Sequence, residues 1–211
     1  MSNDVVFTWT SGGKTQTRTL RAADKIPSRE GLGLWKVDNR AWKVYATTSQ
    51  LSALSSDYTR AQVDAGLPVG TPAPSFQQGS VKQGSKPATQ GFVLIAQWMD
   101  GTNFQKTAAN FRSALEKEKV PKDKNATDYK RCAGYHGCHE GAEVTSSLRI
   151  ATGCNAANTL GLRDCQGYIK TGISEPIRFV DVHTSWNAQT HKYGHSEQAQ
   201  ELVDTITAWA K

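Results

Sequence analysis

Cysteine and histidine gather in one part of the chain, between residues 132 and 195, and the first 131 residues contain neither. The set comprises Cys132, His136, Cys138, His139, Cys154, Cys165, His183, His191 and His195. Such side chains can bind a metal ion, form disulfides or act in catalysis. No spacing among them selects one of these roles.

A metal-dependent hydrolase is one interpretation of the last part of this set. Asp181 and His183 lie two residues apart in a predicted strand over 177–183, and alternate residues of a strand share a face. His191 and His195 could add two ligands if their segment were helical, and Glu197 could move a proton. The glycine at position 194 argues against a helix there. The group therefore supports a hydrolase, with nucleic acid among its substrates, only as an alternative.

Two tripeptides resemble the ligand-x-Glu element of zinc deaminases: Cys-His-Glu at 138–140 and His-Ser-Glu at 195–197. In that chemistry the first residue binds zinc and the glutamate shuttles protons. The element needs Pro-Cys-x-x-Cys downstream, but ten residues separate Cys154 from Cys165 and no cysteine follows His195. The resemblance therefore does not extend to a complete site.

Two further roles for the cysteines rest on residue type. Cys132 could act as a nucleophile with His183 as its base, since a thiolate needs a nearby imidazole. The interpretation that we prefer is structural: disulfides, or zinc bound by Cys132, Cys138 and two histidines, staple the apolar-poor segment 129–168. Four cysteines allow three disulfide connectivities, and the spacing does not choose among them. Zinc is the only cofactor that the sequence brings into consideration.

The composition predicts a thin hydrophobic core and a basic surface. Hydrophobic residues make up 37% of the 211 residues, and the formal net charge is +6. Eight Lys or Arg residues face four acids in the first fifty positions, so strands there could present cations to nucleic acid or an acidic partner. The alternative is that these cations only solvate exposed strand faces. The predicted binding set is Lys14, Arg18, Arg21, Lys36, Arg40 and Lys43.

Hydrophobic periodicity predicts an α+β fold in a single domain, 1–211. Alternating residues predict two antiparallel hairpins, 5–10 with 14–20 and 33–37 with 41–45, followed by a helix over 48–65. A long loop rich in Pro, Gly, Ser and Gln is expected over 66–91. A βα-containing C-terminal part follows, which includes the Cys/His-rich stapled segment. Its predicted elements are strands at 92–98 and 177–183 and helices at 102–120, 141–150 and 196–209. The three subregions are 1–65, 66–91 and 92–211.

These features favour a non-enzymatic structural or assembly protein, of the viral or phage subunit type, over the hydrolase. We expect self-association into a homo-oligomer and contact of the basic β surface with nucleic acid or another partner. No run approaches the roughly 18 apolar residues of a membrane span, and the first residues lack the pattern of a signal peptide. A membrane partner is therefore not expected, and the virion or the cytoplasm is the expected location.

Overall fold

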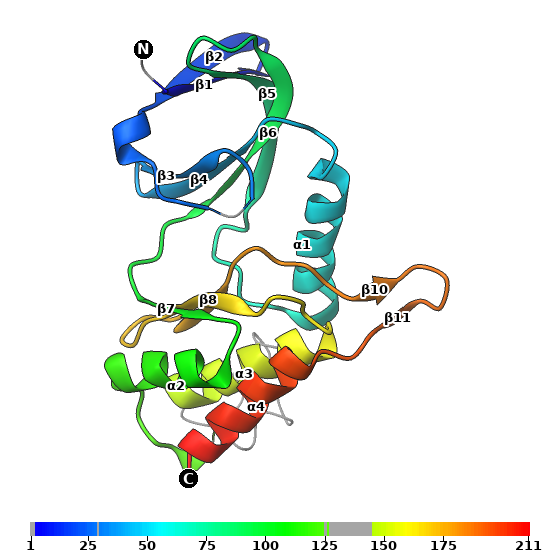
Figure 1. The fold of residues 1–211 in the computed structure, drawn as a ribbon. Helices are drawn as coiled ribbons and strands as arrows, with labels where there is room; N and C mark the ends of the chain where they lie inside the picture. Colours follow the sequence, from blue (N-terminus) through cyan, green and yellow to red (C-terminus); the bar gives the residue numbers. More distant parts are fainter. Residues whose placement is uncertain (1–2, 29, 125, 127–144) are drawn as a thin grey trace. The chain divides into compact units, whose positions relative to one another are not determined.

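The chain divides into two compact units in the computed structural model, which describes residues 3–28, 30–124, 126 and 145–211 (Figure 1). Unit 1 comprises Met1–Ser55 and Gly70–Trp98, and unit 2 comprises Ser56–Val69 and Met99–Lys211. This division does not follow the predicted subregions 1–65, 66–91 and 92–211. The expectation of a single domain stays a prediction.

Unit 1 is built on a six-stranded antiparallel sheet with the strand order β2-β1-β5-β6-β4-β3. Both predicted hairpins are confirmed, the first by β1 and β2 and the second by β3 and β4. A short 3-10 helix, η1 (Ala22–Asp24), follows β2. The strands are β1 (Val5–Ser11), β2 (Lys14–Leu20), β3 (Gly33–Val37), β4 (Arg40–Tyr45), β5 (Ser75–Gln83) and β6 (Thr89–Gln97).

The predicted loop over 66–91 is wrong for nearly half of its length. Strand β5 lies within it, and β6 begins at Thr89, before the predicted strand 92–98. β5 is an inner strand that pairs with β1 on one side and β6 on the other. The sequence of β5 is polar and rich in Gln, Ser and Gly, so its pattern does not predict a strand. Backbone hydrogen bonds to both neighbouring strands hold it in the extended conformation.

The sheet of unit 1 curls, so that residues near its two edge strands meet (Figure 1). The Trp35 indole on edge strand β3 donates a hydrogen bond of 2.9 Å to the carbonyl of Arg21, just after edge strand β2. Arg18 on β2 forms an ion pair with Asp38 in the β3–β4 turn. The hydrophobic core fills the inner face of this half-barrel, and its buried members are Val5, Phe7, Leu20, Trp35, Trp42, Val44, Val81 and Val93.

Gly79 of β5 and Gly91 of β6 are paired, and both allow the backbone of a neighbouring strand to approach closely, as the curl requires. A Cβ atom on Gly91 would lie 2.1 Å from the carbonyl oxygen of Tyr45, and one on Gly79 would lie 2.3 Å from that of Thr8. Both contacts are with backbone atoms, which cannot move aside without disturbing the strand pairing. The curl of the sheet therefore depends on the absence of side chains at these positions.

Unit 2 packs helices on a three-stranded antiparallel sheet, in the order β7-β8-β9, and carries a separate β10–β11 hairpin. Helix α4 packs against both α2 and α3. The boundary between the units falls inside helix α1, and the predicted helix over 48–65 is confirmed with a start at Leu51. The elements are α1 (Leu51–Ala65), β7 (Thr102–Gln105), α2 (Ala108–Lys117), α3 (Ser146–Thr159), β8 (Gln166–Ile169), β9 (Ile177–Phe179), β10 (Trp186–Asn187), β11 (Lys192–Tyr193) and α4 (Glu197–Trp209).

Local signals explain where the helices of unit 2 begin. The hydroxyls of Thr107, Thr145 and Ser196 each accept a hydrogen bond from the backbone N–H three residues ahead, at the N-termini of α2, α3 and α4. The predicted final helix at 196–209 is confirmed by α4. The predicted helix over 102–120 is wrong at its start, because β7 occupies the first four residues and α2 begins only at Ala108.

The bounds of two other predicted elements of unit 2, the helix over 141–150 and the strand over 177–183, differ in the structure. α3 begins at Ser146 and extends to Thr159, beyond the predicted end of the helix at 150. The predicted strand over 177–183 ends at Phe179, because Asp181 adopts a left-handed backbone with φ of 50° and interrupts the extended chain. The α+β class is thus confirmed. Of the helices in the described ranges, none has the length and apolarity needed to span a membrane.

We predict that Gly91→Ala lowers the free energy of unfolding by about 2 kcal/mol, because the added methyl meets backbone on a neighbouring strand. Gly12→Ala is the matched control: its Cβ would meet nothing within 4 Å, and only the backbone strain of its φ of 57°, roughly 1 kcal/mol, opposes it. Urea denaturation measures both. Equal losses in the two variants would contradict the close packing of β6 against β4.

Candidate functional site

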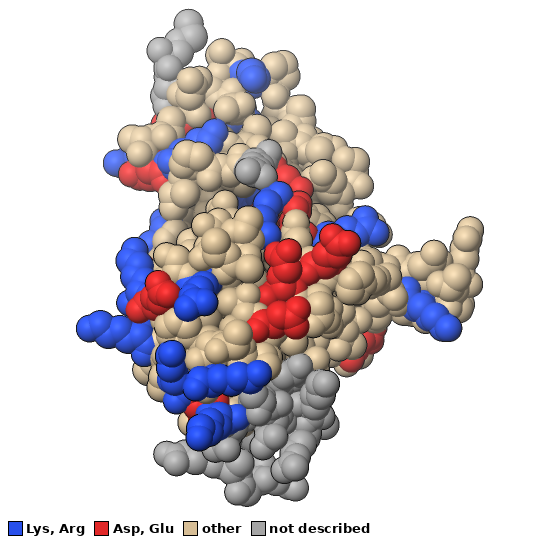
Figure 2. Space-filling model, turned by 60° about the horizontal axis from the view of Figure 1, so that its bottom comes forward, with Lys and Arg blue, Asp and Glu red and all other residues tan. Residues whose placement is uncertain are grey.

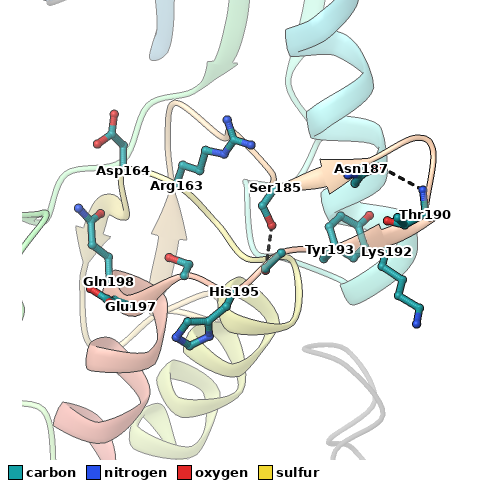
Figure 3. Close-up of a pocket in the computed structure, with 12 residues that line it drawn as sticks. Arg163, Asp164, Ser185, Asn187, Thr190, Lys192, Tyr193, His195, Glu197 and Gln198 are labelled. Atoms are coloured by element: carbon teal, nitrogen blue, oxygen red, sulfur yellow. Dashed lines mark hydrogen bonds between the residues drawn. The ribbon is translucent and has the colours of Figure 1, made fainter.

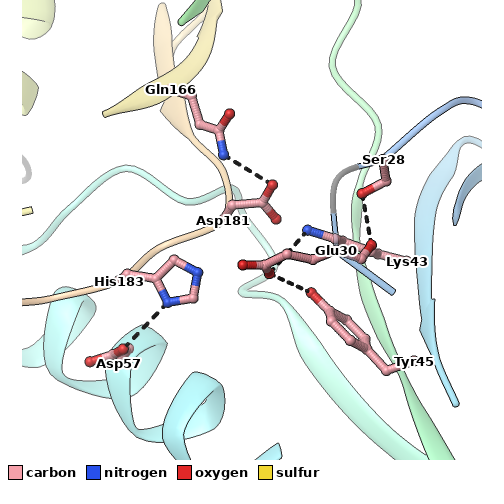
Figure 4. Close-up of polar contacts among 8 residues, drawn as sticks. All are labelled: Ser28, Glu30, Lys43, Tyr45, Asp57, Gln166, Asp181 and His183. Atoms are coloured by element: carbon pink, nitrogen blue, oxygen red, sulfur yellow. Dashed lines mark hydrogen bonds and ion pairs between the residues drawn. The ribbon is translucent and has the colours of Figure 1, made fainter. Parts of the chain in front are cut away.

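The predicted hydrolase group is distributed over several places in unit 2. His183 lies 3.9 Å from Asp57 of α1, measured from Nδ1 to Oδ2, and the other carboxylate oxygen of Asp57 accepts a hydrogen bond of 2.6 Å from Thr184 (Figure 4). Asp181 instead accepts a hydrogen bond of 3.0 Å from the amide of Gln166. The structure therefore gives Asp181 and His183 different partners.

The remaining two histidines of that group lie elsewhere. His191 is in the turn of the β10–β11 hairpin, and its ring centroid lies 6.0 Å from that of Trp186. His195 lines a groove at the start of α4 (Figure 3). Within the described parts of the chain, no three or more His, Cys, Asp or Glu side chains come together in a group that could hold a metal ion. The geometry thus adds no support to a site formed by Asp181, His183 and these two histidines.

The groove in Figure 3 has a volume of about 640 Å³ and lies between the β10–β11 hairpin and the first turn of α4. Arg163, Lys192 and His195 bring basic groups to it, while Asp164 and Glu197 bring carboxylates. The Asp164 carboxylate is already engaged by Lys106 at 2.7 Å. Glu197, the predicted proton shuttle, lies here without Asp181 or His183 among the lining residues. The mixed charge of the groove selects no class of ligand.

The predicted staple falls partly outside the described residues, where Cys132, His136, Cys138 and His139 lie. The two cysteines that the structure does describe, Cys154 in α3 and Cys165 before β8, are free thiols and fully buried. Burial raises the pKa of both, and it raises that of Cys165 from 9.0 to about 12. Thiols held in this neutral form are poor nucleophiles and poor metal ligands. In the described segments, therefore, no disulfide or metal staple supports the prediction.

We predict that Cys154 and Cys165 resist a thiol reagent at pH 8 in the folded protein and react at once in denaturant. The raised pKa of Cys165 means that folding favours its neutral thiol, so this contribution to stability is present below pH 9 and is lost as the pH rises towards about 12. The measurement is a colorimetric thiol titration of a Cys132→Ser, Cys138→Ser variant. Rapid labelling of the native protein, or none in denaturant, would contradict two buried free thiols.

The predicted cationic set divides between the two faces of the sheet in unit 1. Directly paired residues of antiparallel strands share a face, and Arg18 pairs with the core residue Phe7, while Lys14 pairs with Ser11 on the same face. Arg40 lies two residues from the core residue Trp42 and so also projects to the inner face. Lys14, Arg18 and Arg40 thus belong to one face of the sheet.

The other members of the set lie apart from this face. Lys36 and Lys43 alternate with inner residues and project to the opposite face. Lys43 is nearly buried and lies 3.7 Å from the carboxylate of Glu30, which also contacts the Tyr45 hydroxyl (Figure 4). Lys36 lies over the ring of Trp98, and Arg21 follows β2 outside the sheet. The six predicted cations therefore do not form one patch.

Arg18 reaches the second hairpin because of the curl. Arg18 forms its ion pair with Asp38 and places its guanidinium carbon 5.9 Å from the ring centroid of Trp42. Arg40 lies between these two contacts in the sequence. Its side chain is exposed and, like that of Lys14, has no hydrogen-bond or ion-pair partner in the residues that the structure describes. We call Lys14, Arg18 and Arg40, together with the neighbouring Trp9, the cationic face.

An aromatic cluster lies beneath these cations. The rings of Phe7 and Trp9 stack at 5.3 Å, and Trp9 meets Trp42 edge to face at 5.9 Å. Phe7 and Trp42 are buried, whereas Trp9 is only half-buried. The indole nitrogen of Trp42 is the one buried side-chain nitrogen or oxygen without a hydrogen-bond partner in the described ranges. Leaving such a donor unsatisfied costs roughly 1–3 kcal/mol.

Sequence reasoning missed this arrangement, although part of its signal is local. The tight turn at Gly12 and Gly13 pairs Ser11 with Lys14, and that register already places Arg18 opposite Phe7. The other part is not local, because only the curl brings β4, with Arg40 and Trp42, to the same place.

A second group of cations lies in unit 2, after helix α2. Lys117, Lys119, Lys122 and Lys124 are all exposed, and the intervening Glu118 accepts two hydrogen bonds from Thr102. Figure 2 looks towards the end of the molecule that carries α2 and α4 and shows several Lys and Arg side chains next to one another. Of this group, Lys122 lies over the ring of Trp209 at 5.6 Å. This group of lysines has no cluster of several aromatic rings like that of the cationic face among its described contacts. It is typical of the solvated end of a helix.

No family model matches the chain, and comparisons with curated proteins and with solved structures find no match either.

Proposed function

We propose that the protein is a non-enzymatic nucleic-acid-binding protein of the structural or assembly kind, and that unit 1 contacts nucleic acid through the cationic face. The observation that supports this most is the position of Arg18, on edge strand β2, beside Trp42 of β4. Trp42 in turn lies against the partly exposed Trp9 and two residues from Arg40 on the same face of the sheet. Polar or acidic side chains at positions 18 and 40 could border the rim of the hydrophobic core equally well. Two arginines there favour an anionic ligand.

The charges of the cationic face suit phosphate groups. Arginine presents a planar fork of donors that matches two phosphate oxygens at once, and each neutralised phosphate releases counterions from the nucleic acid. Arg40 and Lys14 are exposed and free to make such contacts. Arg18 is held by Asp38, whose side chain is 80% exposed. An ion pair so open to water is worth only about 0–1 kcal/mol, so a phosphate can compete for the guanidinium.

Self-association, expected from the composition, stays a prediction beside this proposal, as does the virion or cytoplasm as the location. The metal-dependent hydrolase stays the alternative prediction, and no group of three or more His, Cys, Asp or Glu side chains in the described residues supports it.

We predict that Arg40→Gln weakens binding of a fluorescein-labelled 20-mer oligonucleotide about three- to tenfold at low salt, measured by fluorescence anisotropy. Because one phosphate contact is lost, the slope of log affinity against log salt concentration should fall by about 1. Lys36→Gln is the matched control: it removes one charge from the neighbouring strand of the same hairpin, on the opposite face.

Two results would count against the proposal. One is the absence of any salt-dependent binding by the wild-type protein. The other is an equal loss in Arg40→Gln and Lys36→Gln, which would mean that net charge matters and that the face does not.

A further inference from the structure

Trp9 is the member of the aromatic cluster that is placed to meet a ligand. Its ring is fixed by stacking on Phe7 at 5.3 Å and by the edge-to-face contact with Trp42 at 5.9 Å. Phe7 is fully buried and Trp42 nearly so, but Trp9 stays half-buried at the rim of the core. A large ring that is held rigid and left partly open is a stacking platform that needs no rearrangement before it binds.

The three cations of the cationic face lie on the same face of the sheet as this ring. Arg18 lies beside Trp42, on the strand that pairs directly with that of Trp9, and Lys14 lies four residues further along the same face of β2. Arg40 lies two residues from Trp42 on β4. Positive charges on the same face as a partly exposed aromatic ring suit a chain in which planar bases alternate with phosphates.

We infer that the nucleic acid bound by the cationic face is single-stranded, with one base stacked on Trp9 and the flanking phosphates on Arg18 and Arg40. This inference rests on the proposed function and adds the substrate class to it. Trp42, whose ring meets Trp9 edge to face, has an indole N–H without a hydrogen-bond partner in the described residues.

A duplex cannot use the same site fully. Its bases are stacked on one another and paired at their edges, so their flat surfaces are closed to a ring at the rim of a core. A duplex could still contact the arginines through its phosphates, as could any polyanion. The ratio of single-strand affinity to duplex affinity therefore measures the contribution of stacking on Trp9 beyond that of charge.

The test is a set of anisotropy titrations of the full chain with three probes: a labelled 12-residue oligothymidylate, a labelled 12-base-pair duplex and labelled heparin, which carries charge but no bases. We expect the single strand to bind at least tenfold more tightly than either of the others at equal salt. Trp9→Leu should reduce that preference to less than threefold while leaving duplex binding unchanged. Trp186→Leu, which removes a half-buried tryptophan from unit 2, is the matched control and should change neither.

A second measurement on the wild-type protein covers the case in which Trp9→Leu does not fold. Saturation with oligothymidylate should lower the quenching of tryptophan fluorescence by acrylamide, whereas saturation with the duplex should not. Trp9→Phe, which keeps a ring in the cluster, should retain part of the preference.

The outcomes separate this inference from the function on which it rests. Equal, salt-dependent affinity for all three probes would overturn single-strand recognition and leave nucleic-acid binding through charge intact. The same conclusion would follow if Trp9→Leu folded and kept the full preference, or if acrylamide quenching were unchanged by oligothymidylate. No binding of any probe would overturn both.

Discussion

The curl of the six-stranded sheet is the constraint on which the rest of unit 1 depends. In a flat sheet with the order β2-β1-β5-β6-β4-β3, four strands would separate Arg18 on β2 from Asp38 beside β3. The ion pair between these residues, and the hydrogen bond from Trp35 to the chain after β2, exist only because the sheet bends back on itself. Gly79 and Gly91 make that bend sterically possible.

The same curl creates the site. It brings Trp42 of the second hairpin against Trp9 of the first and places Arg18 over it. One end of the core is thus bordered by the rings of Trp9 and Trp42 and by the Arg18 guanidinium. Within the described residues, the indole N–H of Trp42 has no hydrogen-bond partner in this arrangement.

Local patterns in the sequence were sufficient for some elements and insufficient for others. The two hairpins and α4 follow from alternation, a tight turn and the cap at Ser196, which act over a few residues. Strand β5 could not be found in this way, because its polar sequence is ordered by β1, more than sixty residues earlier, and by β6. The predicted strand at 177–183 failed for a different reason, since the left-handed backbone at Asp181 ends it.

The candidate site, too, was predicted from the sequence only in part. The types of its residues were visible in the sequence, where Arg18 and Arg40 belonged to the predicted cationic set. That set also contained Lys36 and Lys43, which the strand register sends to the opposite face. The histidines and cysteines drew attention by their rarity, yet His183, His191 and His195 have separate environments and Cys154 and Cys165 are buried thiols. Composition identified candidates, and only the three-dimensional register could choose among them.

The central claim is that nucleic acid lies on the cationic face of unit 1, and photochemical crosslinking tests it most directly. An oligonucleotide carrying 5-bromouracil is irradiated with the full chain, and the attached peptides are identified by mass spectrometry. The account predicts adducts within residues 5–20 and 33–45, with Trp9 the principal site of attachment. Adducts confined to unit 2, for example to the lysines at 117–124, would contradict it.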